Sequence, residues 1–338
     1  MYYYIHILRR LSFIKVLNFI KLLLSYHISR LIHKPLVWGR PFSISVEPTT
    51  SCNLRCPQCP SGLRSFSRDI GMLEPELFNG ILEQLKKYVH NIVFYFQGEP
   101  FLNPKFLEMV KLAEQKGIYT ITSTNAHYIT EDLAKKTVLS GLSKLIISVD
   151  GADQESYEKY RVGGDLTKVL QGTKHLVQQK KALNLKTPTV VWQFIVFKHN
   201  ENQINQIKSL AKEYGVDKIQ IKTAQIYDYE NGSELIPENA EFSRYKRTEN
   251  GNYQIKNKLL NQCWRMWQGC VITWNGLVVP CCFDKDAKHQ MGDMQKESFQ
   301  NIWFSDKYTR FRAKILKGRS EIDICTNCTE GTKVWSDD

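Results

Sequence analysis

Three cysteines stand close together in the segment EPTTSCNLRCPQCPSG, which covers residues 47–62. Cys52, Cys56 and Cys59 are separated by three and two residues, and no fourth thiol lies near them in the sequence. A closed zinc site uses four ligands, whereas three thiolates can bind three irons of a four-iron cluster and leave the fourth iron open. The spacing therefore favours a cluster with one exchangeable position.

A second group of thiols lies toward the carboxyl end of the chain. Cys263 and Cys281 flank the segment VITWNGLVVP (271–280), in which Asn-Gly between two apolar runs predicts a hairpin. Cys325 and Cys328 follow in CTNC. Four thiolates are enough to close a metal site, and the residues alone do not separate zinc from iron-sulfur, because four cysteines serve both.

The composition is that of a globular protein of 338 residues with nine cysteines and a formal net charge of +12. Thiols at this density would form mixed disulfides in an oxidising compartment, and no cleavable signal is evident, so a reducing cytoplasm is expected. The positive charge indicates an anionic partner, for which nucleic acid, acidic lipid and a phosphorylated substrate all qualify.

Some of this charge lies in residues 1–40, and the first acidic residue of the chain is Glu47. No uncharged run in this segment reaches the roughly 20 apolar residues that cross a bilayer. Its pattern predicts a basic amphipathic helix, which would lie on the inner face of an anionic membrane or else pack on its own protein or a second copy. The predicted polar stripe is Lys15, Asn18, Lys21, Ser25 and Ser29, opposite Phe13, Val16, Leu17, Ile20, Leu23 and Leu24.

From residue 42 onward, apolar strand patterns alternate with amphipathic helical patterns. Such repeated βα units predict a parallel sheet, either open or curled into most of a barrel. The helical patterns follow Pro75, Pro104, Thr130, Asp165 and Ile204. The six predicted strands are residues 42–46, 91–96, 118–123, 144–149, 190–197 and 217–222.

Polar motifs follow the first four of these strands. The three cysteines come after the first, QGEP (97–100) after the second, TNA (124–126) after the third and DG (150–151) after the fourth. The carboxyl ends of parallel strands meet at one edge of a sheet, where ligands bind. The alternation therefore predicts a cavity that brings together a metal cluster, two carboxylates and an amide. Trp192, Gln193, Lys222 and Tyr227 are candidates for its opposite wall.

The three-cysteine loop with these companions resembles the radical S-adenosylmethionine (radical SAM) superfamily. That resemblance implies a partial (β/α)6 TIM-like barrel and a four-iron four-sulfur (4Fe-4S) cluster whose open iron binds S-adenosylmethionine (SAM). One-electron reduction then releases a 5′-deoxyadenosyl radical, and a flavodoxin or ferredoxin is the implied reductant. The implied cluster ligands are Cys52, Cys56 and Cys59, and the implied SAM contacts are Gly98, Glu99, Pro100, Thr124, Asn125, Ser148, Asp150 and Arg161.

Two residues depart from the usual pattern of this superfamily. Gln97 stands where its Gly-Gly-Glu-Pro motif has the first glycine, and Gln58 stands where many members have an aromatic residue. The second departure leaves the stacking of the adenine unassigned. His127, just past Asn125, is a loop or core histidine in this interpretation rather than a cavity residue. No general acid or base is assigned from the sequence.

The carboxyl-terminal segment resembles the SPASM extension, in its shortened twitch form, which binds one auxiliary 4Fe-4S cluster. Cys282 is the alternative to Cys281, because neighbours on a strand point to opposite faces. Cys270 is expected to be a buried thiol that binds no metal. The implied ligands are Cys263, Cys281, Cys325 and Cys328.

The resemblance favours a hydrogen-abstracting oxidoreductase of the dehydrogenase or epimerase type, acting on a polyol, sugar or lipid-linked substrate. In alcohol-oxidising relatives the auxiliary cluster accepts an electron. A maturase of a ribosomal peptide is the alternative enzyme, and a non-catalytic iron-sulfur or zinc-binding protein is the alternative of another class. No nucleic-acid module is recognised. The expected organisation is an N-terminal helix (1–40), a partial barrel (41–230), a linker (231–262) and a SPASM/twitch domain (263–338).

Overall fold

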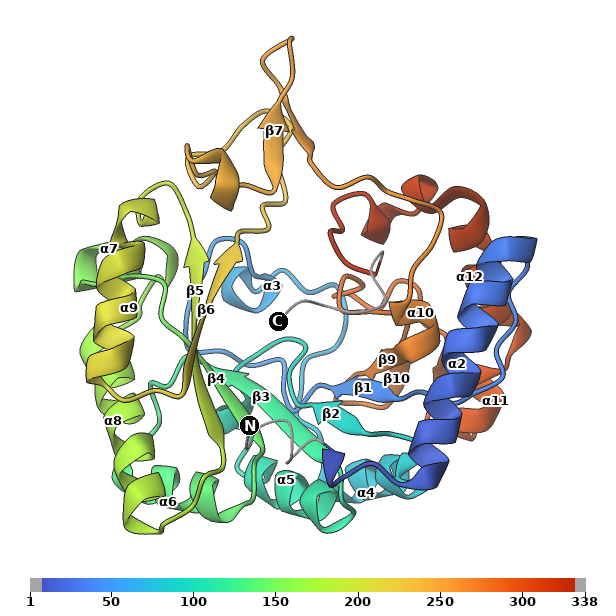
Figure 1. The fold of residues 1–338 in the computed structure, drawn as a ribbon, viewed down its shortest axis with the longest axis horizontal. Coiled ribbons are helices and arrows are strands. Elements are labelled where there is room, and N and C mark those ends of the chain that lie inside the picture. Colours follow the sequence, from blue (N-terminus) through green and yellow to red (C-terminus); the bar gives the residue numbers. More distant parts are fainter. Residues whose placement is uncertain (1–7, 332–338) are drawn as a thin grey trace.

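Six parallel strands in sequential order form the centre of the molecule (Figure 1). The computed structural model describes residues 8–331, so the ends of the expected N-terminal segment and C-terminal domain, residues 1–7 and 332–338, lie outside the described residues. The strands curve around the centre of the view, and the predicted α/β fold with a parallel sheet is confirmed. Their bounds are β1 (Ser43–Val46), β2 (Asn91–Val93), β3 (Tyr119–Thr124), β4 (Lys144–Ser148), β5 (Thr189–Val196) and β6 (Lys218–Thr223).

Helices between these strands cover the outer face of the sheet (Figure 1). Their buried sides carry the predicted apolar residues, as in α4, where Phe78, Ile81 and Leu82 are inaccessible to solvent. The predicted cap of α6 is present, because the hydroxyl of Thr130 accepts a hydrogen bond from the Leu133 amide at 3.2 Å. The helices are α4 (Pro75–Leu85), α5 (Phe106–Gln115), α6 (Glu131–Leu139), α7 (Gln154–Tyr160), α8 (Leu166–Ala182) and α9 (Ile204–Glu213).

The carboxyl-terminal hairpin extends this sheet and does not stand apart from it. Strand β9 (Gly269–Ile272) pairs in parallel with β1, and β10 (Leu277–Val279) returns antiparallel beside β9. Gly276 in the connecting turn has φ +86°, which only glycine adopts readily. Strand β11 (Gly292–Asp293) completes the nine-stranded sheet, and the helices around it are α10 (Arg265–Gln268), α11 (Phe299–Trp303) and α12 (Asp306–Gly318).

Residues 231–262, expected to be a polar linker, contain a second small hairpin. Strands β7 (Tyr245–Arg247) and β8 (Tyr253–Ile255) pair antiparallel and project away from the main sheet (Figure 1). The Tyr245 hydroxyl accepts a hydrogen bond from the Ile226 amide at 2.8 Å, which fixes the base of the hairpin to the end of the barrel. Three-residue strands with polar tips carry too little apolar periodicity to be recognised in the sequence.

The predicted amphipathic helix is α2 (Phe13–Ile32), and its polar stripe faces the protein except at Lys21, which is exposed. Lys15 and Asn18 are buried, with the Lys15 amine donating to the Gly117 carbonyl at 3.0 Å and the Asn18 amide donating to the Arg40 carbonyl at 2.8 Å. The ring of Tyr26 packs against the C-terminal segment. The helix therefore packs on its own chain through its polar side. Among residues 8–331, no helix has the length and hydropathy to cross a membrane.

Candidate active site and auxiliary cluster site

The loop after β1 brings Cys52, Cys56 and Cys59 together. Burial, followed by the neighbouring charges of Glu99, Cys56 and Cys59, raises the pKa of Cys52 to about 11, so the three thiols share one environment. Thiols with raised pKa values are poor nucleophiles in the metal-free protein. They become thiolates when an iron cluster compensates their charge. The loop therefore suits metal binding better than nucleophilic catalysis.

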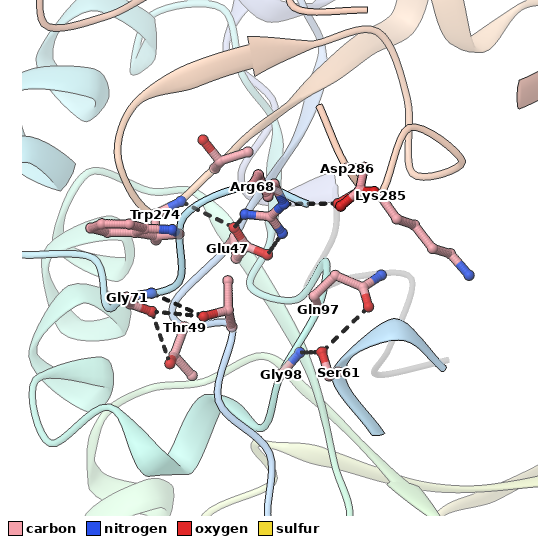
Figure 2. Close-up of polar contacts among 12 residues, drawn as sticks. Glu47, Thr49, Ser61, Arg68, Gly71, Gln97, Gly98, Trp274, Lys285 and Asp286 are labelled. Carbon is pink, nitrogen blue, oxygen red and sulfur yellow. Dashed lines mark hydrogen bonds and ion pairs between the residues drawn. The ribbon is translucent and has the colours of Figure 1, made fainter. Parts of the chain in front are cut away.

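Two glycines allow the motifs after β1 and β2 to approach each other. Gly98 has φ +75°, and a Cβ there would lie 2.2 Å from the Thr49 carbonyl oxygen, so only glycine fits. Its amide donates to the Ser61 hydroxyl at 2.9 Å, and the Ser61 hydroxyl in turn donates to the side-chain oxygen of Gln97 at 3.4 Å (Figure 2). A Cβ at Gly62 would lie 2.6 Å from the Cys56 amide nitrogen. The cysteine loop is therefore held by close backbone contact.

Glu99 is the buried centre of the predicted SAM contacts. Its carboxylate accepts hydrogen bonds from the Thr124 hydroxyl and the Asn125 amide, both at 2.8 Å, so the motifs after β2 and β3 meet. Burial raises the pKa of Glu99 to about 7, although the hydrogen bonds oppose this shift. Pro100 follows directly and begins a short 3-10 helix, Pro100–Leu102.

Asn125 links the same motif to the cysteine loop. Its side-chain amide donates to the side-chain oxygen of Asn53 at 2.8 Å and lies 4.0 Å from the Cys52 sulfur. The residues that follow β1, β2 and β3 thus form one connected polar network. Ser148, at the end of β4, is also buried.

Arg161 and Asp150 form a buried ion pair beside the same loop. The Arg161 Nε atom lies 2.6 Å from a carboxylate oxygen of Asp150, whose other oxygen accepts from the Ile195 amide at 2.7 Å. A second guanidinium nitrogen of Arg161 lies 3.8 Å from the Cys56 sulfur. The guanidinium can therefore balance the negative charge of a thiolate-bound cluster. Arg161 is not a solvated surface charge.

His127 connects two loops rather than entering the cavity. Its Nε2 atom accepts a hydrogen bond from the Asp165 amide at 2.8 Å, so its Nδ1 atom carries the proton and donates to the Asn125 carbonyl at 2.9 Å. This agrees with the loop or core role expected of it. Gln58 accepts a hydrogen bond from the Tyr227 amide at 2.8 Å, which joins the cysteine loop to the segment after β6.

The candidate wall residue Trp192 is turned away from the cavity, which corrects that expectation. Its indole nitrogen donates to the Thr173 hydroxyl at 3.1 Å, within the core between β5 and α8. Successive side chains on a strand point to opposite faces, and the apolar run of residues 190–197 does not indicate which face Trp192 occupies.

The second group of thiols is brought together by segments far apart in the chain. Burial, with a contribution from the charge of Cys263, raises the pKa of Cys325 to about 11 and that of Cys328 to about 12. Burial likewise raises the pKa of Cys281, followed by the charges of Cys282, Cys263 and Cys328. Cys282 itself is exposed to solvent. Cys263, Cys281, Cys325 and Cys328 therefore form one mutually interacting set.

Arg319, which belongs to no motif recognised in the sequence, lies beside this set. It is inaccessible to solvent, and its guanidinium lies 3.2 Å from the Cys328 sulfur. The same group donates to the carbonyls of Gln262 and Glu330 at 2.9 and 2.6 Å. Each thiol group thus has an arginine beside it, the partly buried Arg161 or the buried Arg319, that can compensate the charge of a cluster. Within residues 8–331, no three His, Cys, Asp or Glu side chains are arranged to hold a single metal ion.

A buried ion pair joins the cysteine loop to the C-terminal hairpin (Figure 2). Arg68 contacts both carboxylate oxygens of Glu47, at 2.8 and 2.5 Å, and also donates to the Lys285 carbonyl at 2.8 Å. The Trp274 amide lies 3.3 Å from the same carboxylate. The two thiol groups are therefore carried by segments that are bonded to each other.

A cavity of about 290 Å³ is lined by residues of β1, β2, β6 and β9 and by Cys281 of the second thiol group. Tyr95 and Phe96, just before the Gly98 motif, line one side, and Cys281 lines another. Three cations and one acid, Lys222, Arg244, Arg265 and Glu330, are among its described lining residues. A second hollow of about 430 Å³ beside Pro60 is lined by Tyr227, so this candidate wall residue does face an open space.

Comparison with known proteins identifies two domains in the chain. The model described as the radical SAM superfamily matches residues 46–211, and the model described as the SPASM iron-sulfur cluster-binding domain matches residues 263–329. The tungsten-containing aldehyde ferredoxin oxidoreductase cofactor-modifying protein of Pyrococcus furiosus is 26% identical over 313 residues, covering 84% of this chain and 86% of the relative.

Solved structures share the fold at low identity. BtrN in complex with AdoMet and 2-DOIA has a TM-score of 0.55 and 21% identity, covering 86% of this chain and 94% of that one. Streptococcus suis SuiB bound to the precursor peptide SuiA has a TM-score of 0.61 and 15% identity, covering 86% of this chain and 70% of that one.

Proposed function

Because the chain belongs to the radical SAM superfamily and carries a C-terminal SPASM domain, we propose that this enzyme abstracts a carbon-bound hydrogen from a polyol, sugar or lipid-linked substrate. Its cofactors are SAM, a 4Fe-4S cluster that binds it, and an auxiliary iron-sulfur cluster. Together, SAM and its cluster supply the 5′-deoxyadenosyl radical that takes the hydrogen atom. In the proposal the reaction is a dehydrogenation, with the auxiliary cluster as electron acceptor.

The residues described above have distinct roles in this proposal. Cys52, Cys56 and Cys59 hold the SAM-binding cluster, and Arg161 compensates its charge from a position fixed by Asp150. The network centred on Glu99 binds the amino group of SAM. Cys263, Cys281, Cys325 and Cys328 hold the auxiliary cluster. Gly98, Pro100, Thr124, Asn125 and Ser148 shape the SAM site around Glu99.

The polar and positively charged lining of the cavity of about 290 Å³ supports this choice of substrate. Its wall includes hydroxyl and amide side chains, which suit a polyhydroxylated molecule. The excess of cations over Glu330 among the described lining residues suits a phosphate or another anionic group on that molecule. Cys281 on the same wall supports electron transfer from the substrate to the auxiliary cluster.

A peptide substrate is the second candidate, and one observation favours it. The hollow of about 430 Å³ beside Pro60 opens next to the cysteine loop and offers Tyr227, Lys288 and Asn327 as partners for a peptide backbone. One protein of similar fold, SuiB, has been solved with a precursor peptide.

The test measures 5′-deoxyadenosine release by the reconstituted, reduced protein in the presence of a sugar phosphate, a polyprenyl-linked sugar or a peptide. The proposal expects stimulation by the sugar phosphate or the polyprenyl-linked sugar, together with a product lighter by two hydrogens. Stimulation by a peptide alone would replace the proposal with the maturase alternative. No SAM cleavage under any condition would favour a non-catalytic iron-sulfur or zinc protein.

The buried carboxyl of Glu99 predicts that SAM binding weakens as the pH falls below about 7. Its pKa is raised to about 7 by burial, so the free protein protonates it there, whereas a bound ammonium group favours the carboxylate. Below pH 7, SAM binding must then release a proton from Glu99, and the affinity for SAM falls by up to about tenfold for each unit by which the pH is lowered. The same raised pKa makes the folded SAM-free protein less stable as the pH rises from about 4.5 through 7, because the native carboxyl holds its proton over this range.

Isothermal titration of SAM between pH 5.5 and 8.5 checks this prediction, with E99Q as the matched variant. Glutamine has nearly the shape of glutamate but does not titrate. The decrease in SAM affinity below pH 7 that Glu99 causes should therefore disappear in E99Q, and only the pH dependence that comes from SAM itself should persist. An unchanged slope in E99Q would exclude Glu99 as its cause.

A further inference from the structure

The exposed side of α2 is almost entirely apolar. Phe13 is 82% exposed, Leu24 is 52% exposed and Leu31 is 80% exposed, and the exposed Trp38, which follows the helix in the chain, lines a hollow with Ile14 and Leu17. Exposed apolar residues in such a contiguous row are unusual on a monomer and mark interaction surfaces. The face, named here the α2 apolar face, consists of Phe13, Ile14, Val16, Leu17, Ile20, Leu24, Leu31, Ile32 and Trp38.

The helix is bonded in an orientation that keeps this face outward. Lys15, Asn18 and Ser29 all direct their polar atoms into the protein, where each bonds a backbone group outside the helix. Rotating the helix to bury the apolar side would leave these buried backbone groups without partners, which is costly. The outward apolar face is therefore a property of the folded state.

Basic groups border the face, and no acidic residue occurs before Glu47. Lys21 is exposed between Leu17 and Leu24 on the helix, and Arg9 and Lys34 are exposed beyond its two ends. A small hollow of about 170 Å³ runs along the face and is lined by Ile14, Leu17, Lys21, Trp38, Arg40 and Phe304. Apolar walls with two cations at the rim suit an acyl chain whose anionic headgroup stays outside.

We propose that the α2 apolar face docks on the surface of a bilayer that contains anionic lipid. A helix lying in the interface buries one apolar side and places its cations among the headgroups, which is the arrangement of residues here. A second copy of the chain fits less well, because face-to-face pairing would bring Lys21 and its basic neighbours against the same residues of the partner. The proposal does not depend on the substrate of the enzyme.

Cosedimentation of the full chain with vesicles tests this proposal. Vesicles of phosphatidylcholine and phosphatidylglycerol should bind the protein, and vesicles of phosphatidylcholine alone should bind it more weakly, by roughly fivefold for each cation that reaches the surface. Raising the salt from about 0.1 M to about 1 M should reduce the difference between the two vesicles. No binding to either vesicle would overturn the proposal.

Two variants distinguish docking through the α2 apolar face from nonspecific adsorption to the vesicles. Leu17→Glu combined with Leu24→Glu places two acids on the face and should lower vesicle binding by at least about tenfold. Leu139→Glu is the matched control, because Leu139 is 56% exposed on α6 and outside the face. It should bind like the wild type. Equal losses in both would overturn the proposal, provided that thermal unfolding shows both variants folded.

The same proteins distinguish lipid from a second copy of the chain. In the absence of vesicles, light scattering after size exclusion should show the same oligomeric state for the wild type and for the double variant. A wild-type dimer that becomes a monomer in the double variant, without vesicle binding, would instead assign the face to self-association.

Discussion

Replacing Cys56 with alanine is expected to abolish reductive cleavage of SAM. Cys56 is one of only three thiols in its loop, and its sulfur lies 3.8 Å from the guanidinium of Arg161. A cluster with two remaining thiolates loses its site, since even residues that merely support metal ligands cost about 10–100-fold when removed. We therefore expect a loss of more than about 100-fold, measured as 5′-deoxyadenosine released under strong reductant.

Cys270→Ala is the matched control for this change. Cys270 is also buried and lies on β9, yet its pKa is raised by burial with no charge from another cysteine, so it stands apart from both thiol sets. Its removal should leave iron content and SAM cleavage at wild-type levels. Undiminished cleavage by Cys56→Ala would contradict the assignment of the cysteine loop as the SAM-binding site.

The repeated βα units were predictable because local patterns determine them. Each of the six strands begins or ends within three residues of its predicted bounds, as with β4, predicted at 144–149 and observed at Lys144–Ser148. The convergence of the motifs after β1, β2 and β3 followed from the rule that parallel strands end at one edge. Thr124 and Asn125 both donate hydrogen bonds to the Glu99 carboxylate.

What depends on non-local contact could not be predicted. The pairing of β9 with β1 joins residues far apart in the chain, and neither strand's sequence specifies its neighbour. The amphipathic pattern of α2 predicted an apolar and a polar face but did not indicate which of them is buried. The polar face is the buried one, because Lys15 and Asn18 donate hydrogen bonds to backbone carbonyls beneath the helix. Arg319 had no signal at all, because an arginine at a helix end is usually a solvated charge.

The two adjacent cysteines of the C-terminal domain lead to the second prediction. Cys281 interacts with Cys263 and Cys328, whereas Cys282 is exposed and has Arg265 among its neighbours. Cys281→Ala should therefore lose the auxiliary cluster, with iron falling from about eight to about four per chain. Cys282→Ala, its matched control, should keep all of it.

Activity in the Cys281→Ala variant then separates the two clusters by role. SAM cleavage should persist, because Cys52, Cys56 and Cys59 and the Glu99 network are untouched, but oxidation of the substrate should stop for want of an electron acceptor. Iron and zinc analysis with 5′-deoxyadenosine measurement checks both parts. If Cys282→Ala loses the iron instead, Cys282 is the ligand. If zinc occupies the site, the C-terminal domain is structural and the electron must leave the substrate by another route.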